Sequence, residues 1–232
     1  MMTEVKQREF SETVPVQYED GFVLFMGEKI KVDPRVLIPR PETEVLVKVT
    51  ANELSAPVKR EYKVLDMCTG SGVVAIALCK LVLGVRMTAA DISREALDVA
   101  RENVEALGLS ERIELMASDM FLSFAQDRED LYDAIVSNPP YVSGRDFELL
   151  DPWVKAEPVV ALYAGKDGMD SINALCSQSG KFLRKGGFLA LEIGYNQSFM
   201  TERKMVENGF REIKIYKDDN GYSRVIIGWK NG

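Results

Sequence analysis

The residues most informative about chemistry are Asn138-Pro139-Pro140-Tyr141, directly after an apolar run that ends at Ser137. Two consecutive prolines fix the backbone and remove two N–H donors, so nearby carbonyl groups stay free to accept hydrogen bonds. An amide nitrogen is a poor nucleophile because its lone pair is delocalised. The Asn138 side-chain oxygen and the Pro139 carbonyl could each accept one of its N–H bonds, while Tyr141 packs against the planar group. The motif predicts a platform that aims such a nitrogen at a methyl group; the alternative is a sharp strand end.

A glycine-rich turn lies within residues 63–77, where a strand-like run leads through Gly70 and Gly72 into a helical run. In an open α/β sheet, ligands bind beyond the carboxyl ends of the strands, beside such a turn. Asp91 ends the next strand-like run about 20 residues later, where an acidic residue binds ribose hydroxyls in nucleotide-binding folds. The spacing predicts a small-molecule pocket. Alternatively, the glycines only form the turn and Asp91 only flanks a helix.

Three successive strand-like runs end in an aspartate, namely Asp66, Asp91 and Asp119. Because parallel strands end at one edge of a sheet, the three carboxylates could contact one extended ligand, although each could also serve as a cap. Cys68 lies in the same turn and is not expected to be a nucleophile, because no histidine or nearby basic residue could generate its thiolate.

The composition excludes several kinds of chemistry. The 232 residues include no histidine, which removes histidine bases, Ser/His and Cys/His nucleophiles and histidine metal ligands. We therefore expect no metal. The net charge of −7 gives no basic excess for phosphate binding, so a nucleic-acid substrate is disfavoured.

Targeting signals and cysteine usage point to a cytoplasmic protein. The three cysteines fit neither a disulfide framework nor a zinc site. No apolar run approaches the roughly 20 residues needed to cross a bilayer, and the first 20 residues are too charged for a signal peptide. We expect a soluble protein without membrane contact and with one catalytic unit.

The elements that must position these residues alternate along the chain, which predicts a parallel sheet flanked by helices. Ser93 is a candidate N-cap and Gly108 a candidate stop for the helix between the second and third strands. The expected strands include residues 64–65, 85–90, 113–117, 134–136, 188–193, 212–216 and 224–229.

The first 57 residues are predicted to form a short extension, a β-hairpin and a first helix, followed by the catalytic domain at 58–232. The hairpin is expected over 22–26 and 29–32. Pro41 is the expected first helical residue, because proline is favoured at the first position of a helix.

The ordered motifs resemble the release factor glutamine N5-methyltransferases of the HemK type over roughly residues 21–230. The motifs are 36–44 (VLIPRPETE), the 66–72 turn, 90–93 (ADIS), 138–141 (NPPY), Glu157-Pro158, Ala161-Leu162, Gly165 with Asp167-Gly168, 191–194 (LEIG) and Gln197. Several independent motifs in order make a chance similarity improbable. The resemblance implies the α/β fold of class I methyltransferases, a Rossmann-like, mostly parallel sheet of seven strands whose last strand is antiparallel.

The resemblance also implies the cofactor S-adenosylmethionine and the residues that surround it. The implied cofactor-binding residues are Asp66, Cys68, Thr69, Gly70, Ser71, Gly72, Asp91, Ile92, Asp119, Met120 and Asn138. The segment from Asn138 to Tyr141 would hold the glutamine. Arg40 and Glu42 would contact ligand or neighbouring loops, or only begin a helix.

The implied substrate is the Gly-Gly-Gln motif of a peptide chain release factor, which acts in translation termination. Relatives typically carry a helical domain before the hairpin, where only about 20 residues stand in this sequence. Two alternatives stay open. One is an amino-methylating DNA or RNA methyltransferase that acts on a flipped adenine with a similar motif. The other is a catalytically idle S-adenosylmethionine-binding module.

Overall fold

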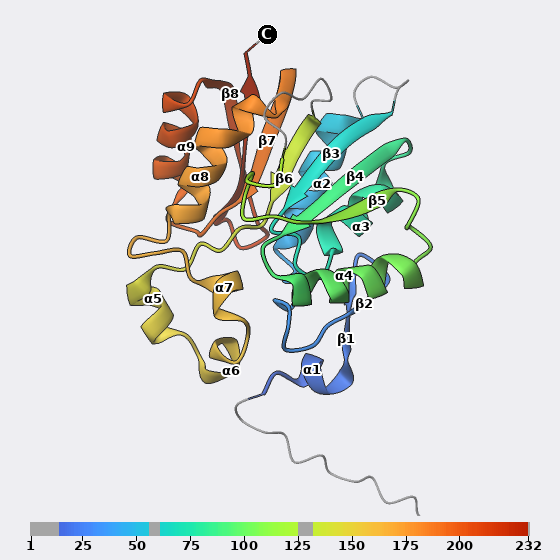
Figure 1. The fold of residues 1–232 in the computed structure, drawn as a ribbon. Coiled ribbons are helices and arrows are strands. Elements are labelled where there is room, and N and C mark those ends of the chain that lie inside the picture. The colour runs from blue at the N-terminus through green and yellow to red at the C-terminus, as the bar shows by residue number, and fades with distance from the viewer. Residues whose placement is uncertain (1–13, 56–60, 125–131, 232) are drawn as a thin grey trace, which may run out of the picture.

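The computed structural model describes residues 14–55, 61–124 and 132–231, so the predicted domain boundary at 57/58 lies outside the described residues. A seven-stranded sheet has the order β5-β4-β3-β6-β7-β9-β8 (Figure 1). The strands are β3 (Tyr62–Met67), β4 (Val85–Asp91), β5 (Ile113–Ala117), β6 (Tyr132–Ser137), β7 (Leu183–Glu192), β8 (Phe210–Lys217) and β9 (Ser223–Lys230). Strand β9 is antiparallel to both of its neighbours, while the pairs among β3 to β7 are parallel. The predicted fold class is confirmed.

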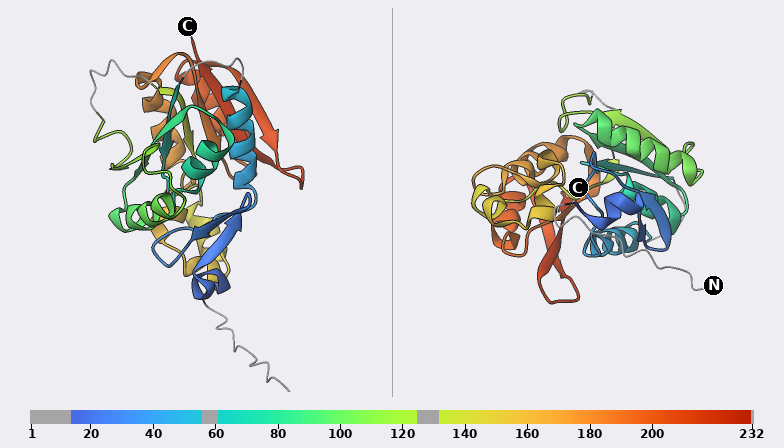
Figure 2. Two further views of the ribbon diagram at one scale, coloured as in Figure 1. Left: turned by 90° about the vertical axis from the view of Figure 1, so that its right-hand side faces the viewer. Right: turned by 90° about the horizontal axis from the view of Figure 1, so that it is seen from below.

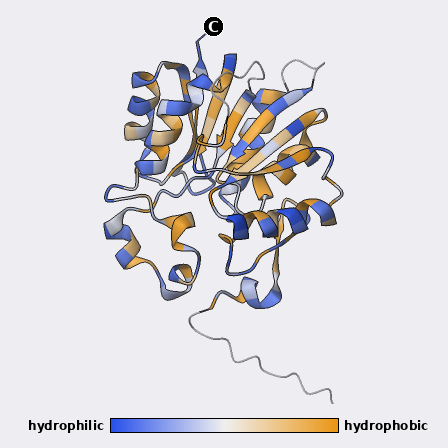
Figure 3. Ribbon diagram, in the orientation of Figure 1, coloured by the Kyte–Doolittle hydropathy of each residue, from blue (hydrophilic) through white to orange (hydrophobic). Residues whose placement is uncertain are grey.

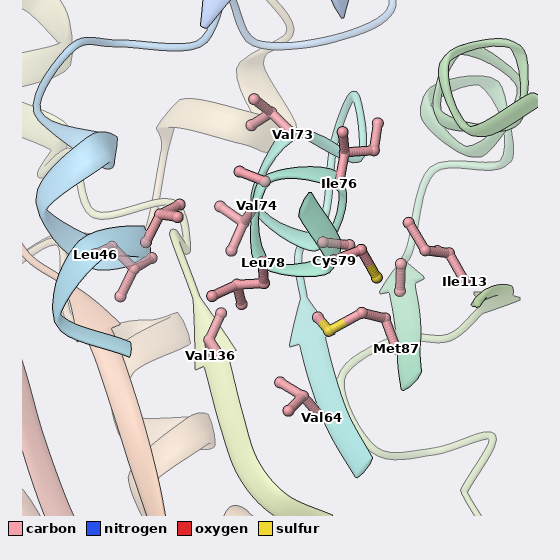
Figure 4. Close-up of a cluster of buried hydrophobic side chains, with 14 of the residues drawn as sticks. Leu46, Val64, Val73, Val74, Ile76, Leu78, Cys79, Met87, Ile113 and Val136 are labelled. Atoms are coloured by element: carbon pink, nitrogen blue, oxygen red, sulfur yellow. The ribbon is translucent and has the colours of Figure 1, made fainter. Parts of the chain in front are cut away.

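Helices cover both faces of the sheet, because the central strands are apolar on both sides (Figure 3). One core joins β3, β4 and β6 to α2 (Thr43–Leu54), α3 (Val73–Leu81) and α4 (Arg94–Ala106). Figure 4 shows Leu46 of α2 and Leu78 of α3 around Val136 of β6. The opposite core holds α8 (Asp170–Gln178), α9 (Ser198–Glu207) and Phe182, which follows the 3₁₀ turn η1 (Ser179–Lys181), against the other side chains of β6 and β7.

Two small units lie beyond the carboxyl ends of the parallel strands (Figures 1 and 2). The first contains α1 (Val16–Asp20) and the hairpin of β1 (Phe22–Phe25) with β2 (Glu28–Lys31), which confirms the expected hairpin. The second contains the short helices α5 (Gly144–Leu149), α6 (Pro152–Lys155) and α7 (Val159–Leu162), between β6 and β7 in the sequence. Both units therefore flank the edge of the sheet where the motif residues were expected.

The start of α2 differs from the prediction that Pro41 is its first helical residue. The amide groups of Thr43 and Glu44 donate to carbonyl groups only three residues back, those of Arg40 and Pro41, at 3.1 and 3.0 Å. Pro41 and Glu42 thus form a tight turn, and the regular helix begins at Thr43.

The other predicted helix signals are confirmed. The Ser93 hydroxyl accepts a hydrogen bond from the Ala96 amide at 3.1 Å and caps α4, which ends two residues before Gly108. Within the described ranges, no helix has the length and apolar character that a bilayer crossing requires.

Candidate functional site

A cavity of about 380 Å³ lies at the carboxyl ends of β3, β4 and β6, and its volume is in the range of small-molecule sites. Eight residues predicted from the sequence line it, namely Cys68, Gly70, Asp91, Ile92, Asp119, Met120, Asn138 and Pro140. The opposite wall comes from residues 35–37, which follow the hairpin unit, and from residues 158–161 at the start of α7. The sheet edge supplies the polar groups of the cavity, and the added units cover them.

The two glycines of the turn have different roles. A Cβ atom at Gly72 would lie 3.3 Å from Ala100 Cβ, so this glycine permits close packing of α3 against α4. A Cβ at Gly70 would meet no heavy atom of the protein within 4 Å, and Gly70 lines the cavity. Only Gly70 therefore leaves backbone open to a ligand.

Asp66, Thr69 and Ser71 are buried and do not line the cavity. Asp66 Oδ2 accepts hydrogen bonds from Thr69 Oγ1 at 2.6 Å and from the Ala75 amide at 3.2 Å. Burial raises the pKa of Asp66 to about 7. Asp66 and Thr69 thus hold the turn in shape from behind, which makes Asp66 a support for the pocket in this structure.

Cys68 adopts a φ of 62°, in the left-handed region that favours glycine, and its side chain lines the cavity. Burial raises the pKa of its thiol well above its usual range, and nearby Asp91 raises it further. The thiol therefore stays protonated, in agreement with the expectation that Cys68 is not a nucleophile.

Asp91 lies at the end of β4 with both carboxylate oxygens held in place. They accept hydrogen bonds from the Gly70 amide at 2.8 Å and from the Ser93 amide at 2.9 Å. Burial raises the pKa of Asp91, and these backbone bonds oppose the rise. Each oxygen keeps a second lone-pair direction for a ligand hydroxyl. Asp119 and Met120 line the cavity after β5.

Asn138 follows β6 and is half-buried at the cavity wall. Its Nδ2 donates a hydrogen bond to the hydroxyl of buried Thr43, the first residue of α2, at 3.2 Å. No donor from the described part of the chain reaches Asn138 Oδ1, so the side-chain oxygen is available as an acceptor. Pro140 lines the cavity, whereas Pro139 is buried behind it.

Tyr141 does not line the cavity, and its position depends on two partners. Its hydroxyl lies 3.4 Å from Glu192 Oε1, and its carbonyl accepts a hydrogen bond from Gln197 Nε2 at 3.0 Å. The same nitrogen donates to the Gly168 carbonyl at 3.0 Å, while Gln197 Oε1 accepts from the Gly194 amide at 2.8 Å. One buried side chain thus joins three loops behind the motif.

Glu157 connects the two units that cover the cavity. Its side chain is completely buried, accepts a hydrogen bond from the Ile38 amide at 2.9 Å and forms an ion pair with Arg40. The Arg40 guanidinium also lies 5.5 Å from the centroid of the Trp153 ring, within cation–π range. Arg40 thus contacts a neighbouring loop, one of the two roles considered for it.

Replacing Glu157 with alanine should lower the free energy of unfolding by about 2 kcal/mol, because the Ile38 amide loses its buried acceptor and Arg40 its partner. Urea unfolding would measure the loss. Glu207→Ala is the matched control, since Glu207 makes exposed ion pairs with Arg203 and Lys204 on α9 and such pairs contribute little. Equal midpoints for the two variants would show that the buried contacts do not stabilise the fold.

Sequence reasoning gave no role to four residues that support the site, namely Thr43, Glu157, Glu192 and Gln197. All four occur in the recognised motifs, but their partners are distant in sequence: Glu157 is 119 residues from Ile38. The only local signal was a glutamate inside the apolar run 188–193. In the described segments, no group of three or more potential ligand side chains could hold a metal ion.

Comparison with known proteins agrees with this geometry. The family model for "Methyltransferase small domain" matches residues 42–154. The chain is 40% identical over 217 residues to a protein of Streptococcus pneumoniae named release factor glutamine methyltransferase, covering 92% of this chain and 74% of that protein. It is 33% identical over 220 residues to the protein of the same name from Clostridium acetobutylicum, covering 94% and 76%.

A solved structure from Alicyclobacillus acidocaldarius resembles the chain in both fold and sequence. It is described as a release factor-specific protein-(glutamine-N5) methyltransferase, with a TM-score of 0.54 and 30% identity. The match covers 87% of this chain and 99% of that one.

Proposed function

Because the chain belongs to the release factor glutamine methyltransferases, we propose that it transfers a methyl group from S-adenosylmethionine to the side-chain amide nitrogen of a glutamine in a release factor. The observation that carries the proposal is Asn138, whose Nδ2 is bonded to Thr43 while its Oδ1 is left as an acceptor at the cavity wall. An acceptor is what a primary amide needs in order to be oriented.

The cavity fits the cofactor in size and in donor set. Asp91 would accept hydrogen bonds from the ribose hydroxyls, and the open backbone at Gly70 would allow close approach of the methionine end. Ile92 and Met120 supply apolar contact for the adenine, since a thioether packs well against aromatic faces. Asp66, Thr69, Ser71 and Gly72 would act through the shape of the turn.

The motif residues would hold the glutamine for reaction. Asn138 Oδ1 and the Pro139 carbonyl accept the two N–H bonds of the amide, which directs the π face of its nitrogen at the methyl group. When bound, S-adenosylmethionine supplies a methyl group activated by the positive sulfur, so the nitrogen needs position more than basicity. The nitrogen would bond to the methyl carbon while the electron pair of the broken carbon–sulfur bond stays on the sulfur. The two acceptors would then stabilise the positive charge on the nitrogen until it gives a proton to water.

The substrate assignment is tested by methyl transfer from labelled S-adenosylmethionine to a purified release factor. We expect label on that factor and none on the same factor with its Gly-Gly-Gln glutamine changed to alanine. Double-stranded DNA is the third substrate, because adenine methyltransferases use a similar motif; the net charge of −7 predicts that it stays unlabelled. Label on DNA alone, or no label on the intact factor, would contradict the proposal.

A further inference from the structure

Glu192, the last residue of β7, is a buried carboxylate beside the motif. Strands β6 and β7 pair in register with Ser137 opposite Leu191, which places Glu192 next to Asn138. Glu192 is only 1% exposed, and its Oε2 has no hydrogen-bond partner among the described residues. An unpaired buried carboxylate lowers the stability of the fold, so its position beside the site suggests that it contributes to function.

Both polar side chains of the motif converge on this carboxylate. The Tyr141 hydroxyl reaches Oε1 directly, at 3.4 Å. Asn138 is linked to it through Thr43, whose hydroxyl accepts from Asn138 Nδ2 at 3.2 Å and which favours the ionised form of Glu192, lowering its pKa. The three residues form a polar chain from the cavity wall into the core.

The charge state of Glu192 determines the direction of this chain. An ionised carboxylate can only accept, so Thr43 must donate to it and must accept from the Asn138 NH₂ group. The Asn138 oxygen then faces the site. A protonated Glu192 can donate to Thr43 instead, which lets Thr43 donate to Asn138 and turn the amide around. An NH₂ group would then meet the NH₂ group of the substrate, where no hydrogen bond can form.

We propose that Glu192 is a positioning residue that, through Thr43, holds the Asn138 amide in its productive orientation when ionised and releases it when protonated. This proposal rests on the proposed function for its effect on rate, but not for the coupling between Glu192 and Asn138.

The titration falls near neutral pH. Burial and, to a smaller extent, Glu42 raise the pKa of Glu192, while Thr43, Arg224 and Tyr141 lower it, and the net result is a pKa of about 7. These groups face Glu192 from the start of α2, from β9 and from the loop after β6. The ionised, productive form therefore accumulates as the pH rises through 7.

The kinetic test is the single-turnover rate of methyl transfer at saturating cofactor and release factor, from about pH 5.5 to about pH 8.5. The wild-type rate should fall about tenfold per pH unit below the pKa. Glu192→Gln should be about 10- to 100-fold slower at high pH and independent of pH, with unchanged cofactor affinity. The matched control Glu202→Gln changes an exposed glutamate of α9 and should keep the wild-type rate and profile. A wild-type pH profile in Glu192→Gln would overturn the proposal.

A second measurement tests the coupling between Glu192 and Asn138 independently of the proposed methyl transfer. The side-chain NH₂ resonances of Asn138, assigned by their loss in Asn138→Ala, should shift with a midpoint near pH 7 in the free protein and not in Glu192→Gln. This shift needs no substrate, so it supports the coupling even if the release factor is not methylated. Resonances that titrate equally in both proteins would contradict it. Glu192→Gln should fold, because it removes a buried charge.

Discussion

Replacing Asn138 with alanine should lower the rate of methyl transfer by at least about 100-fold, because the substrate amide loses its main side-chain acceptor. Without it the amide can rotate away from the direction of attack. Cofactor binding should change only a few-fold, since Asp91 and the turn at Gly70 remain in place. The rate is measured by single turnover, and cofactor affinity by calorimetry.

The matched control is Asn208→Ala, which removes the same group from an exposed position after α9, where its Nδ2 bonds the Lys204 carbonyl. It should transfer methyl groups at the wild-type rate. An Asn138→Ala protein with full activity would rule out the acceptor role, and one that fails to bind cofactor would place Asn138 in the cofactor site alone.

Most of the fold was predictable from local sequence. All seven strand runs were identified, because fully apolar stretches such as β6 and alternating helical stripes such as that of α4 are local patterns. The first residue of α2 was not predicted correctly, because Pro41 suits a tight turn as well as a first helical turn. Glu157 binds the Ile38 amide and Arg40 just ahead of the turn, and this partner is 119 residues from Ile38, so local sequence does not reveal the contact.

In the candidate site, too, local sequence predicted some of the residues and missed others. Cys68, Asp91 and Asn138 lie at or directly after the ends of three strands and line the cavity, because parallel strands end at one edge. Asp66 was predicted to contact ligand, yet it lies one position before the end of β3, and its side chain points into the core toward Thr69. Glu192 and Gln197 act through partners about 50 residues away, and no local pattern in one sequence reveals such pairs.

The second large effect on methyl transfer is expected from a substitution at Gly168, which lies among the contacts behind the motif. Its φ of 71° is left-handed, and a Cβ atom there would lie 2.9 Å from Gln197 Nε2 and closer still to the Tyr141 carbonyl oxygen. Gly168→Ala should therefore displace Tyr141 or Gln197 and shift the adjoining platform. We expect methyl transfer to slow by about 100-fold, because misplacement of about 1 Å has effects of that size.

The control for Gly168→Ala is Gly209→Ala, which separates backbone strain from the clash. Gly209 has a similar φ of 87°, but a Cβ atom there meets nothing within 4 Å. Both variants carry the left-handed strain of roughly 1–2 kcal/mol, so thermal unfolding should show a loss of stability in each. Only Gly168→Ala should lose activity at a temperature where both are folded. Equal rates in the two variants would mean that the reaction tolerates movement of the Tyr141 carbonyl, and that the loops joined by Gln197 stabilise the fold without orienting the substrate.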